Sequence, residues 1–304
     1  MAAFPSPTSK WHTTTYPTLS PTRPELSCKG KTVVVTGGGS GIGAETARYF
    51  AKAGAARIAL LGRREQPLLD TKASIEHKFP GVEVFVAVTD VTKKSDVDTA
   101  FAKFVGDGKV HVVVSNAAAM GPVETVQDVD GEAFVDGVQQ NLKGAIFVAQ
   151  AFLRYASTDA VAINISSSAA HMNFSPGMIS YSTSKFAVCR LWDSVAFANP
   201  ELSIFSIQPG VVDTDMNRAV GGVAALGYED HVSLPASFSV WLASPEARFL
   251  KGKFLWANWD VDELKAKAEQ LQSSPQLSLG LVGWPFSAEN DWKVNWNSQA
   301  AGDA

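Results

Sequence analysis

The stretch Thr32-Val-Val-Val-Thr-Gly-Gly-Gly-Ser-Gly-Ile-Gly43 decides the fold, because an apolar β-branched run leads directly into a glycine-rich turn and a helix start. Gly37, Gly41 and Gly43 are spaced four and two residues apart. Glycine permits positive φ and close backbone approach, while the free amides at a helix start attract a pyrophosphate. Glycines alone would indicate a tight structural turn. In this context they predict a nucleotide site.

The same alternation of strand and helix continues along the chain, which is typical of parallel strands joined by crossover helices. We expect strands at residues 32–36, 57–61, 82–88, 110–115, 161–165, 202–207 and 253–257. Helical patterns lie at residues 42–53, 67–77, 95–104, 132–155, 181–198, 235–243 and 261–271. Most of the strands are continuously apolar, so helices should cover both faces of the sheet. The sequence therefore predicts one α/β, doubly wound domain.

Three segments of different composition are expected. Residues 1–30, rich in Pro, Ser and Thr, form an extended N-terminal arm, for which disorder is the default expectation and docking through Trp11 and Tyr16 the alternative. Residues 31–257 form the dinucleotide-binding catalytic domain, and residues 258–304 a C-terminal extension that packs on it. Most of the Trp residues fall after position 240: Trp241, Trp256, Trp259, Trp284, Trp292 and Trp296. They suit local packing, a subunit interface or a wall of the substrate pocket.

Composition excludes several classes of protein. The 304 residues carry 26 Lys+Arg against 30 Asp+Glu, a net charge of −4, and 46% are hydrophobic. Such a chain can bury a sizeable core, and it lacks the basic balance of a broad nucleic-acid surface. No apolar run approaches the roughly 20 residues of a membrane helix. The first thirty residues lack the features of a secretory signal. Cys28 and Cys189 supply neither a disulfide framework nor a zinc set, which favours a reducing compartment and no metal.

The second predicted strand ends in Leu61-Gly62-Arg63-Arg64. In nucleotide folds of this type, an acidic residue at this point binds the ribose hydroxyls and repels a 2′-phosphate. Here Gly62 removes the acid and two guanidinium groups follow, which suit a phosphate monoester. A solvated basic turn is the alternative. We predict a preference for NADP(H), with Arg63 as the principal contact and Arg64 as the weaker one.

The segment Tyr181-Ser-Thr-Ser-Lys185 carries the candidate chemistry. A spacing of four residues places the phenol and the ammonium on one helix face. A neighbouring cation favours the phenolate form, so the phenol becomes a usable acid or base. A Tyr/Lys pair at this spacing is common on protein surfaces, so its surroundings decide its significance. Three serines that end at Ser168 follow the strand before it, and Asn141 lies within the preceding predicted helix.

Taken together, these motifs resemble the short-chain dehydrogenase/reductase family from about residue 31 to residue 257. The resemblance rests on elements in a fixed order: Thr36-Gly-xxx-Gly-x-Gly43, Asp90-Val91, Asn116-Ala117, Asn141-Leu-Lys-Gly144, Ser167, Tyr181-xxx-Lys185, and Pro209-Gly210 with Thr214. It implies a hydride-transfer enzyme on a Rossmann fold with a seven-stranded parallel sheet. It also implies a cytoplasmic homo-oligomer, dimer or tetramer.

The resemblance assigns four catalytic roles. Tyr181 protonates the substrate oxygen during reduction, and Lys185 assists it while binding the nicotinamide ribose. Ser167 hydrogen-bonds the substrate carbonyl, and Asn141 holds a water. Asp90 and Val91 would lie along the adenine, Asn116 beside the ribose and Thr214 at the nicotinamide carboxamide. The remaining implied cofactor contacts are the glycine turn with Ser40 and Ile42, and Ala117, Pro209, Gly210 and Val212. Without the family, Asp90 and Asn116 would be interpreted as capping residues.

Three features depart from the family pattern. Ala118 stands where many members have Gly. Ser167 precedes Tyr181 by 14 residues, whereas the more frequent spacing of 13 would point to Ser168. Ser167 is preferred because Ser167-Ser-Ala-Ala170 aligns with the usual Ser-x-Ala-Gly. The tail after the last strand is also longer than usual.

Residues 212–234 are expected to form a mobile lid over the substrate. The lid and the segment before Tyr181 offer mostly apolar side chains: Met216, Val220, Val223, Leu226, Tyr228, Met172, Phe174 and Met178. They favour a hydrophobic or aromatic ketone or secondary alcohol, while His171 and His231 are treated as solvated. A redox-neutral epimerase or dehydratase on the same scaffold, and a non-catalytic NADPH-binding sensor, remain alternatives.

Overall fold

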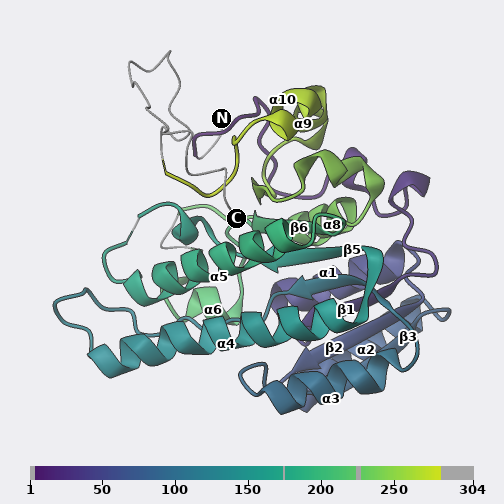
Figure 1. Ribbon diagram of the computed structural model, residues 1–304, viewed down its shortest axis with the longest axis horizontal. Coiled ribbons are helices and arrows are strands. Elements are labelled where there is room, and N and C mark those ends of the chain that lie inside the picture. Colours follow the sequence, from purple (N-terminus) through teal and green to yellow (C-terminus); the bar gives the residue numbers. More distant parts are fainter. Residues whose placement is uncertain (1–3, 174, 224–226, 282–304) are drawn as a thin grey trace, which may run out of the picture.

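Seven parallel strands form one sheet in the order β3-β2-β1-β4-β5-β6-β7 (Figure 1). The computed structural model describes residues 4–173, 175–223 and 227–281; Phe174, Leu226, Trp284, Trp292 and Trp296 lie outside them. The strands are β1 Thr32–Thr36, β2 Arg57–Gly62, β3 Glu83–Val88, β4 Val110–Ser115, β5 Ala156–Ile165, β6 Ser203–Gln208 and β7 Phe254–Trp256. The order reverses between β1 and β4, which confirms the predicted doubly wound α/β fold.

Helices connect these strands at the positions that the sequence pattern indicates. The helices are α1 Gly41–Lys52, α2 Glu65–Lys78, α3 Lys94–Val105, α4 Gly131–Tyr155, α5 Ile179–Ala198, α6 Asp215–Arg218, α8 Ser233–Leu242, α9 Val261–Ala266 and α10 Ala268–Ser273. Short 3-10 helices lie at η1 Pro17–Leu19, η2 Pro24–Leu26, η3 Ser168–Ala170 and η4 Pro245–Leu250. The predicted single helix at 261–271 is two helices, because Lys267 N–H bonds Leu264 C=O three residues back and tightens the turn.

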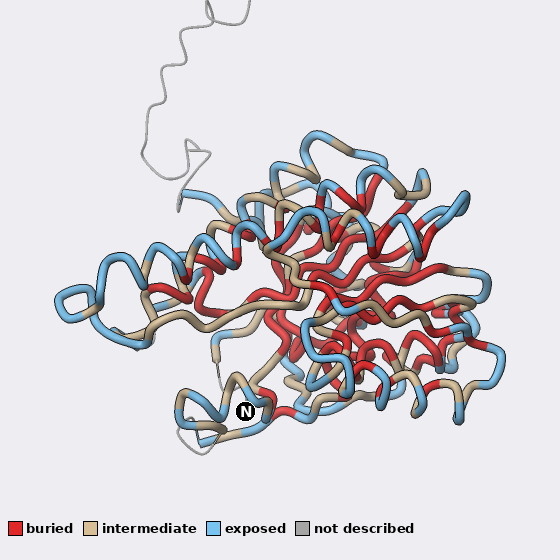
Figure 2. The backbone as a smooth tube through the Cα atoms, turned by 90° about the horizontal axis from the view of Figure 1, so that it is seen from below, coloured by how far each residue is buried: buried red, intermediate tan, exposed pale blue. Residues whose placement is uncertain are grey.

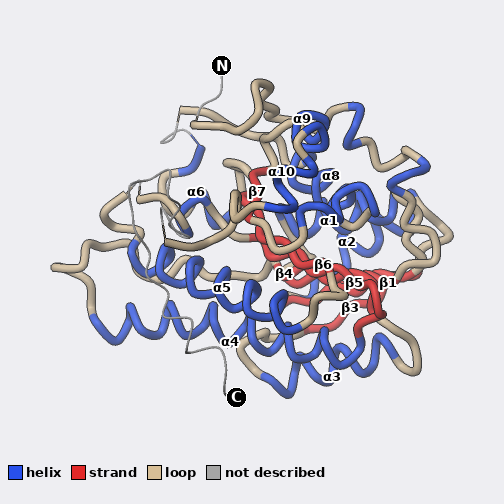
Figure 3. Tube along the Cα trace, turned by 45° about the horizontal axis from the view of Figure 1, so that its top comes forward, coloured by secondary structure: helices blue, strands red, loops and turns tan. Residues whose placement is uncertain are grey.

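The strands lie between two layers of helices, with α3, α4 and α5 on one side and α1, α2 and α8 on the other (Figure 3). Side chains alternate across β1: Val33 and Val35 join the cluster that contains α1 and α8, and Val34 joins the cluster that contains α3 to α5. All five residues of β1 are buried, and buried chain concentrates in this central layer (Figure 2). The continuously apolar strands are therefore covered on both faces.

The N-terminal arm packs against the body of the protein, contrary to the expected disorder. Ser9 and Lys10 backbone N–H groups donate to the Glu263 carboxylate on α9, at 2.6 and 3.0 Å. Trp11 forms an antiparallel bridge with Trp259, and Figure 1 shows the arm running beside α9 and α10. Composition alone missed this docking because the partners lie about 250 residues away in the sequence.

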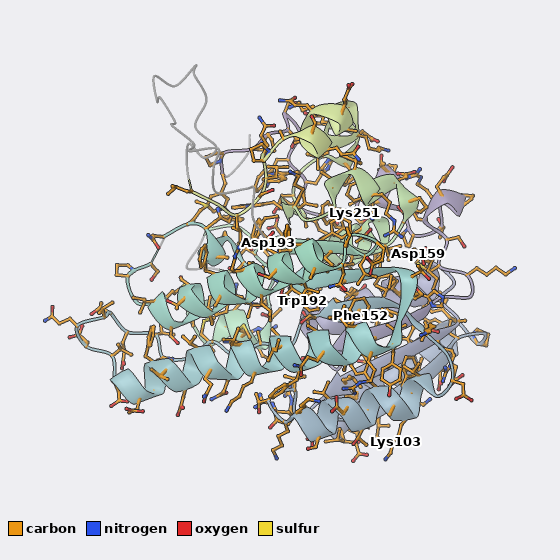
Figure 4. The ribbon with its side chains drawn as sticks, in the orientation of Figure 1. Lys103, Phe152, Asp159, Trp192, Asp193 and Lys251 are labelled. Carbon is orange, nitrogen blue, oxygen red and sulfur yellow. The ribbon has the colours of Figure 1, made fainter. Side chains whose placement is uncertain are left out.

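The second core cluster generates a test of stability. Phe152 on α4 and Trp192 on α5 are fully buried in this cluster (Figure 4), whereas Phe197 at the end of α5 is 92% exposed. We expect Phe152→Ala to lower the free energy of unfolding by about 3–5 kcal/mol. The ring no longer contributes the free energy of its transfer out of water, and the cavity that it leaves adds a further cost. Phe197→Ala should change it by less than about 0.5 kcal/mol. Denaturant titration of both variants measures these values, and equal losses would contradict the assignment of the core.

Candidate active site

A pocket of about 440 Å³ opens at the carboxyl ends of β1, β2, β3 and β4. It lies beside the point where the strand order reverses, which is where ligands bind in open α/β sheets. Its lining comes from four successive strand-to-helix connections: Gly37, Gly39 and Ser40; Gly62, Arg63, Arg64, Pro67 and Leu68; Thr89, Asp90, Val91 and Thr92; and Ala117, Ala118, Ala119, Gln140 and Asn141. Sequence reasoning did not single out six of the lining residues, although all lie within a few residues of a predicted contact: Pro67, Leu68, Thr89, Thr92, Ala119 and Gln140.

The glycine turn has no room for side chains at its two ends. Gly37 has φ +68°, and a Cβ on Gly43 would lie 2.3 Å from the Gly37 carbonyl oxygen and 2.6 Å from Asn116 Nδ2. Ser40 precedes α1 with its hydroxyl free of any capping bond, and Ile42 lies half-buried in the first turn. The turn therefore presents backbone amides and the start of α1 to the pocket.

Asn116 ties the end of β4 to the end of β1. Its Nδ2 donates to Thr36 O at 2.9 Å, while Thr36 Oγ1 accepts the backbone N–H groups of Asn116 and Ala117 at 2.9 and 3.0 Å. These bonds hold the two chain ends beside the glycine turn. Asn116 therefore positions the strand, whereas Ala117 lines the pocket.

The two arginines after β2 differ in their surroundings. Both are exposed and both line the pocket. Arg64 lies 3.6 Å from the Asp215 carboxylate at the start of α6, whereas Arg63 forms no salt bridge with any described residue. Arg63 is thus the guanidinium that remains available for an anion in the pocket.

Asp90 and Val91 form the third side of the pocket. Asp90 Oδ1 accepts from the Thr92 hydroxyl at 2.8 Å and from its backbone N–H at 3.0 Å. These bonds hold the pKa of the Asp90 carboxyl below its usual value, and the bond from the Thr92 hydroxyl has the largest effect. Val91 packs on α4, since a Cβ on Gly144 would lie 3.0 Å from its methyl group.

Tyr181 and Lys185 share one face of α5. Lys185 is 5% exposed, and its Nζ lies 5.5 Å from the centre of the Tyr181 ring and donates to Ile165 O at 2.8 Å. Asn141 Nδ2 donates to Ser184 Oγ at 3.1 Å and to Ala119 O at 2.9 Å, and its Oδ1 accepts from Ala119 N. The fold thus brings the predicted Asn, Tyr and Lys together where α4 and α5 pack.

The serine-rich end of β5 lies next to this group. Ser167 Oγ accepts from Ala169 N at 3.2 Å as the cap of η3. Ser168 is buried, and its backbone N–H donates to Gln208 Oε1 at 2.8 Å. Ser167 is the more exposed of the two, and Gln208, which the sequence did not single out, fixes the backbone of Ser168.

The turn after β6 lies next to the pocket without lining it. Pro209 and Val212 are buried, and Gly210 has φ +96°. Thr214 lies over the glycine turn, since a Cβ on Gly41 would be 3.1 Å from its methyl group. Behind the turn, buried Asp230 accepts from Val211 N at 2.7 Å. No sequence signal identified Asp230.

The structure therefore places the predicted residues in two neighbouring groups. The pocket itself is lined by the glycine turn, Arg63, Arg64, Asp90, Val91, Ala117 and Asn141. Ser167, Tyr181, Lys185 and the 209–214 turn are not among its lining residues. Asn141 belongs to both groups, because it lines the pocket and bonds α5 next to Lys185.

Comparison with known proteins agrees with this geometry. A family model described as short chain dehydrogenase matches residues 31–222. A short chain dehydrogenase/reductase of Claviceps purpurea is 34% identical over 285 residues, covering 92% of this chain and 96% of the relative. The short chain dehydrogenase/reductase AacuD of Aspergillus aculeatus is also 34% identical, over 92% of this chain and 98% of its own.

A solved structure shares the same architecture. The short-chain type dehydrogenase/reductase of Mycobacterium ulcerans is 26% identical and superposes with a TM-score of 0.69, covering 76% of this chain and 89% of that one. Every motif on which the resemblance rests lies within the described residues. The chain belongs to the short-chain dehydrogenase/reductase family.

Proposed function

We propose that this protein is an NADP(H)-dependent oxidoreductase that interconverts a hydrophobic or aromatic ketone and its secondary alcohol, with Tyr181 as general acid and base. Enzymes of this family use nicotinamide cofactors and act on small molecules. One observation carries the proposal: the buried ammonium of Lys185 lies close to the Tyr181 ring, and the neighbouring Ser184 accepts a hydrogen bond from Asn141, which lines the pocket.

Several features of the pocket support the binding of a dinucleotide. The glycine turn would present the backbone amides at the start of α1 to a pyrophosphate, while the absence of a side chain at Gly43 lets the helix pack closely on the Gly37 carbonyl. Arg63 would bind a 2′-phosphate, while Asp90 and Val91 would lie along the adenine. Pro209, Gly210, Val212 and Thr214 would meet the nicotinamide end. When bound, the cofactor supplies or accepts the hydride.

The protein's own groups handle the proton. In reduction, Tyr181 Oη donates its proton to the substrate oxygen, and in oxidation it takes that proton back. Lys185, whose Nζ lies 5.5 Å from the centre of the Tyr181 ring, would bind the nicotinamide ribose beside that ring. The hydroxyl of Ser167 donates to the same substrate oxygen and orients it. Asn141 would hold a water that returns protons from solvent to the site.

The substrate class follows from the side chains around this centre. Met172 and Met178 precede Tyr181 in the sequence, and Met216, Val220 and Tyr228 come from the segment after β6; all are half-buried. Partly covered apolar surface of this kind binds apolar ligand surface better than a charged acid or a sugar. The test is a panel of ketones with NADPH, in which turnover limited to small charged ketones would refute the substrate class.

Assembly and compartment are also proposals. Helices α4 and α5 expose apolar side chains, among them Val135, Leu142, Phe186 and Phe197, which suit a homo-oligomer contact. Both cysteines, Cys28 and Cys189, are free and buried, as a reducing, cytoplasmic setting would allow. Of the helices that the structure describes, none has the length and apolar character needed to cross a membrane.

Removing one hydroxyl tests the chemistry. Tyr181→Phe keeps the ring but removes the exchangeable proton, so turnover should fall by at least about 10²-fold with NADPH affinity unchanged. Tyr155→Phe, at the carboxyl end of α4, is the matched control and should retain activity. Consumption of the reduced nicotinamide reports turnover. Full activity in Tyr181→Phe would exclude the acid role, and tight NADPH binding without turnover on any ketone would indicate a sensor.

The two arginines allow a direct test of cofactor choice. Arg63→Ala should lower the preference for NADP over NAD by about tenfold or more, because a charge-assisted phosphate contact is lost. Arg64→Ala should have a smaller effect, since that guanidinium already faces Asp215. Michaelis constants for both cofactors measure the preference. An unchanged ratio in Arg63→Ala would contradict the assignment.

The glycine turn provides a test that needs no substrate. Gly43→Ala places a methyl group within 2.3 Å of Gly37 O, so the turn must shift and NADPH affinity should fall by about tenfold or more. Gly81→Ala is the control, because no atom lies within 4 Å of its Cβ position. Calorimetric titration measures binding and thermal melting checks the fold. Equal affinity in the two variants would show that the cofactor does not use this turn.

A further inference from the structure

Intermediate residues link the N-terminal arm to the two loops that follow β5 and β6. One loop is the turn at residues 209–212 after β6, and the other is the segment at residues 167–172 after β5. The arm reaches the first through a buried polar chain and the second through aromatic side chains. A further backbone bond, from His231 N to Thr13 O at 2.7 Å, holds the segment that leads into α8.

The polar chain connects the arm to the turn after β6 in three steps. His12 and Asn258 exchange bonds, His12 N to Asn258 O and Asn258 Nδ2 to His12 O, each 2.9 Å. Asn258 Nδ2 also donates to Asp230 Oδ1 at 2.9 Å. Asp230 Oδ2 then accepts from Val211 N at 2.7 Å, and Asp230 N donates to Val211 O at 2.8 Å. Each link is a direct hydrogen bond between named atoms.

This chain holds the turn in one position. Asp230 and Asn258 are each 1% exposed. Within the described residues no cation pairs with Asp230, and burial raises the pKa of its carboxyl. A carboxylate without a cation partner is costly to bury. The hydrogen bonds of Asp230 therefore fix the position of the turn after β6 more than they add to the stability of the core. Its carboxylate presses on Gly210, where a Cβ would lie 2.7 Å from Oδ2.

Aromatic side chains connect the arm to the second loop. The Phe4 ring centre lies 5.2 Å from that of Trp256 and 5.7 Å from that of Tyr228, and Trp11 lies 5.9 Å from Trp256. Trp256 Nε1 donates to His171 Nε2 at 3.1 Å. Burial lowers the pKa of His171, which favours the neutral ring that accepts this bond. Trp256 thus transmits the position of the arm to the loop that follows Ser167.

We infer that arm residues 4–16 form part of the active centre and position its nicotinamide side, with Asp230 and Asn258 as the positioning residues between the arm and the 209–212 turn. The inference rests on the proposed function, in which that turn meets the nicotinamide. If the inference is correct, loosening the arm should weaken the binding of the nicotinamide half of the cofactor. The adenosine half, bound at the glycine turn and Arg63, should be unaffected.

The test compares two ligands on the full-length protein. NADPH contains both halves of the cofactor, and adenosine 2′,5′-bisphosphate contains only the adenosine half. In Asn258→Ala and Trp11→Ala, the Kd of NADPH should rise about tenfold, because a buried hydrogen bond or aromatic anchor is lost. The Kd of the fragment should stay within about twofold. Thr18→Ala is the matched control, since its hydroxyl bonds Asp262 on α9 at 2.6 Å, away from both loops.

The outcomes separate this inference from the proposed function. Weakening of NADPH alone supports it. Equal weakening of both ligands would show a general structural role, and no change in either variant would show that the arm does not act on the turn; both results overturn it. If thermal melting shows that Asn258→Ala is not folded, the ligand affinities of Trp11→Ala, a variant in the half-buried arm, test the inference. A wild-type protein that binds neither ligand would overturn the proposed function, and this inference with it.

Discussion

The close contact between the ends of β1 and β4 is the constraint on which the site depends. Gly43 packs on the Gly37 carbonyl, and Asn116 bonds Thr36 across the same point. Without this contact, the start of α1 could not turn its amides toward the pocket, because any side chain at Gly43 would separate helix from strand. The contact lies at the point where the strand order reverses, and residues that follow four of the strands surround the pocket there.

The candidate catalytic cluster of Asn141, Tyr181 and Lys185 depends on a different constraint, the packing of α4 on α5. The buried Lys185 ammonium is costly to desolvate, and its bond to Ile165 O offsets part of that cost while fixing the chain end before Ser167. Asn141 then joins α4 to α5 through Ser184. The distance between the pocket and Tyr181 is therefore set by helix packing, which is rigid, and not by a loop.

How much of this could be predicted depended on the range of the interaction. The strands at 32–36 and 110–115 match the structure to the residue, and the spacing of Tyr181 and Lys185 correctly placed both on one helix face. These signals are local periodicities. Asp230 and Gln208 could not be found, because their significance comes from partners at Val211, Asn258 and Ser168 that no local pattern specifies. Disorder of the arm was the wrong default for the same reason, and the alternative, docking through Trp11 and Tyr16, is what the structure shows.

For the Trp residues that the structure describes after position 240, the position of the arm favours local packing over a subunit interface or a wall of the substrate pocket. Trp241 is a buried residue of α8, whereas Trp256 and Trp259 lie against the arm, through Phe4 and Trp11 and the Trp11–Trp259 bridge. Their apolar surface is thus covered by the same chain. A segment rich in proline loses less conformational entropy on ordering than a flexible one, so a few aromatic anchors suffice to hold it. Those anchors lie beside the loops that follow β5 and β6, so the cover for the Trp residues is at the same time a support for the reaction centre.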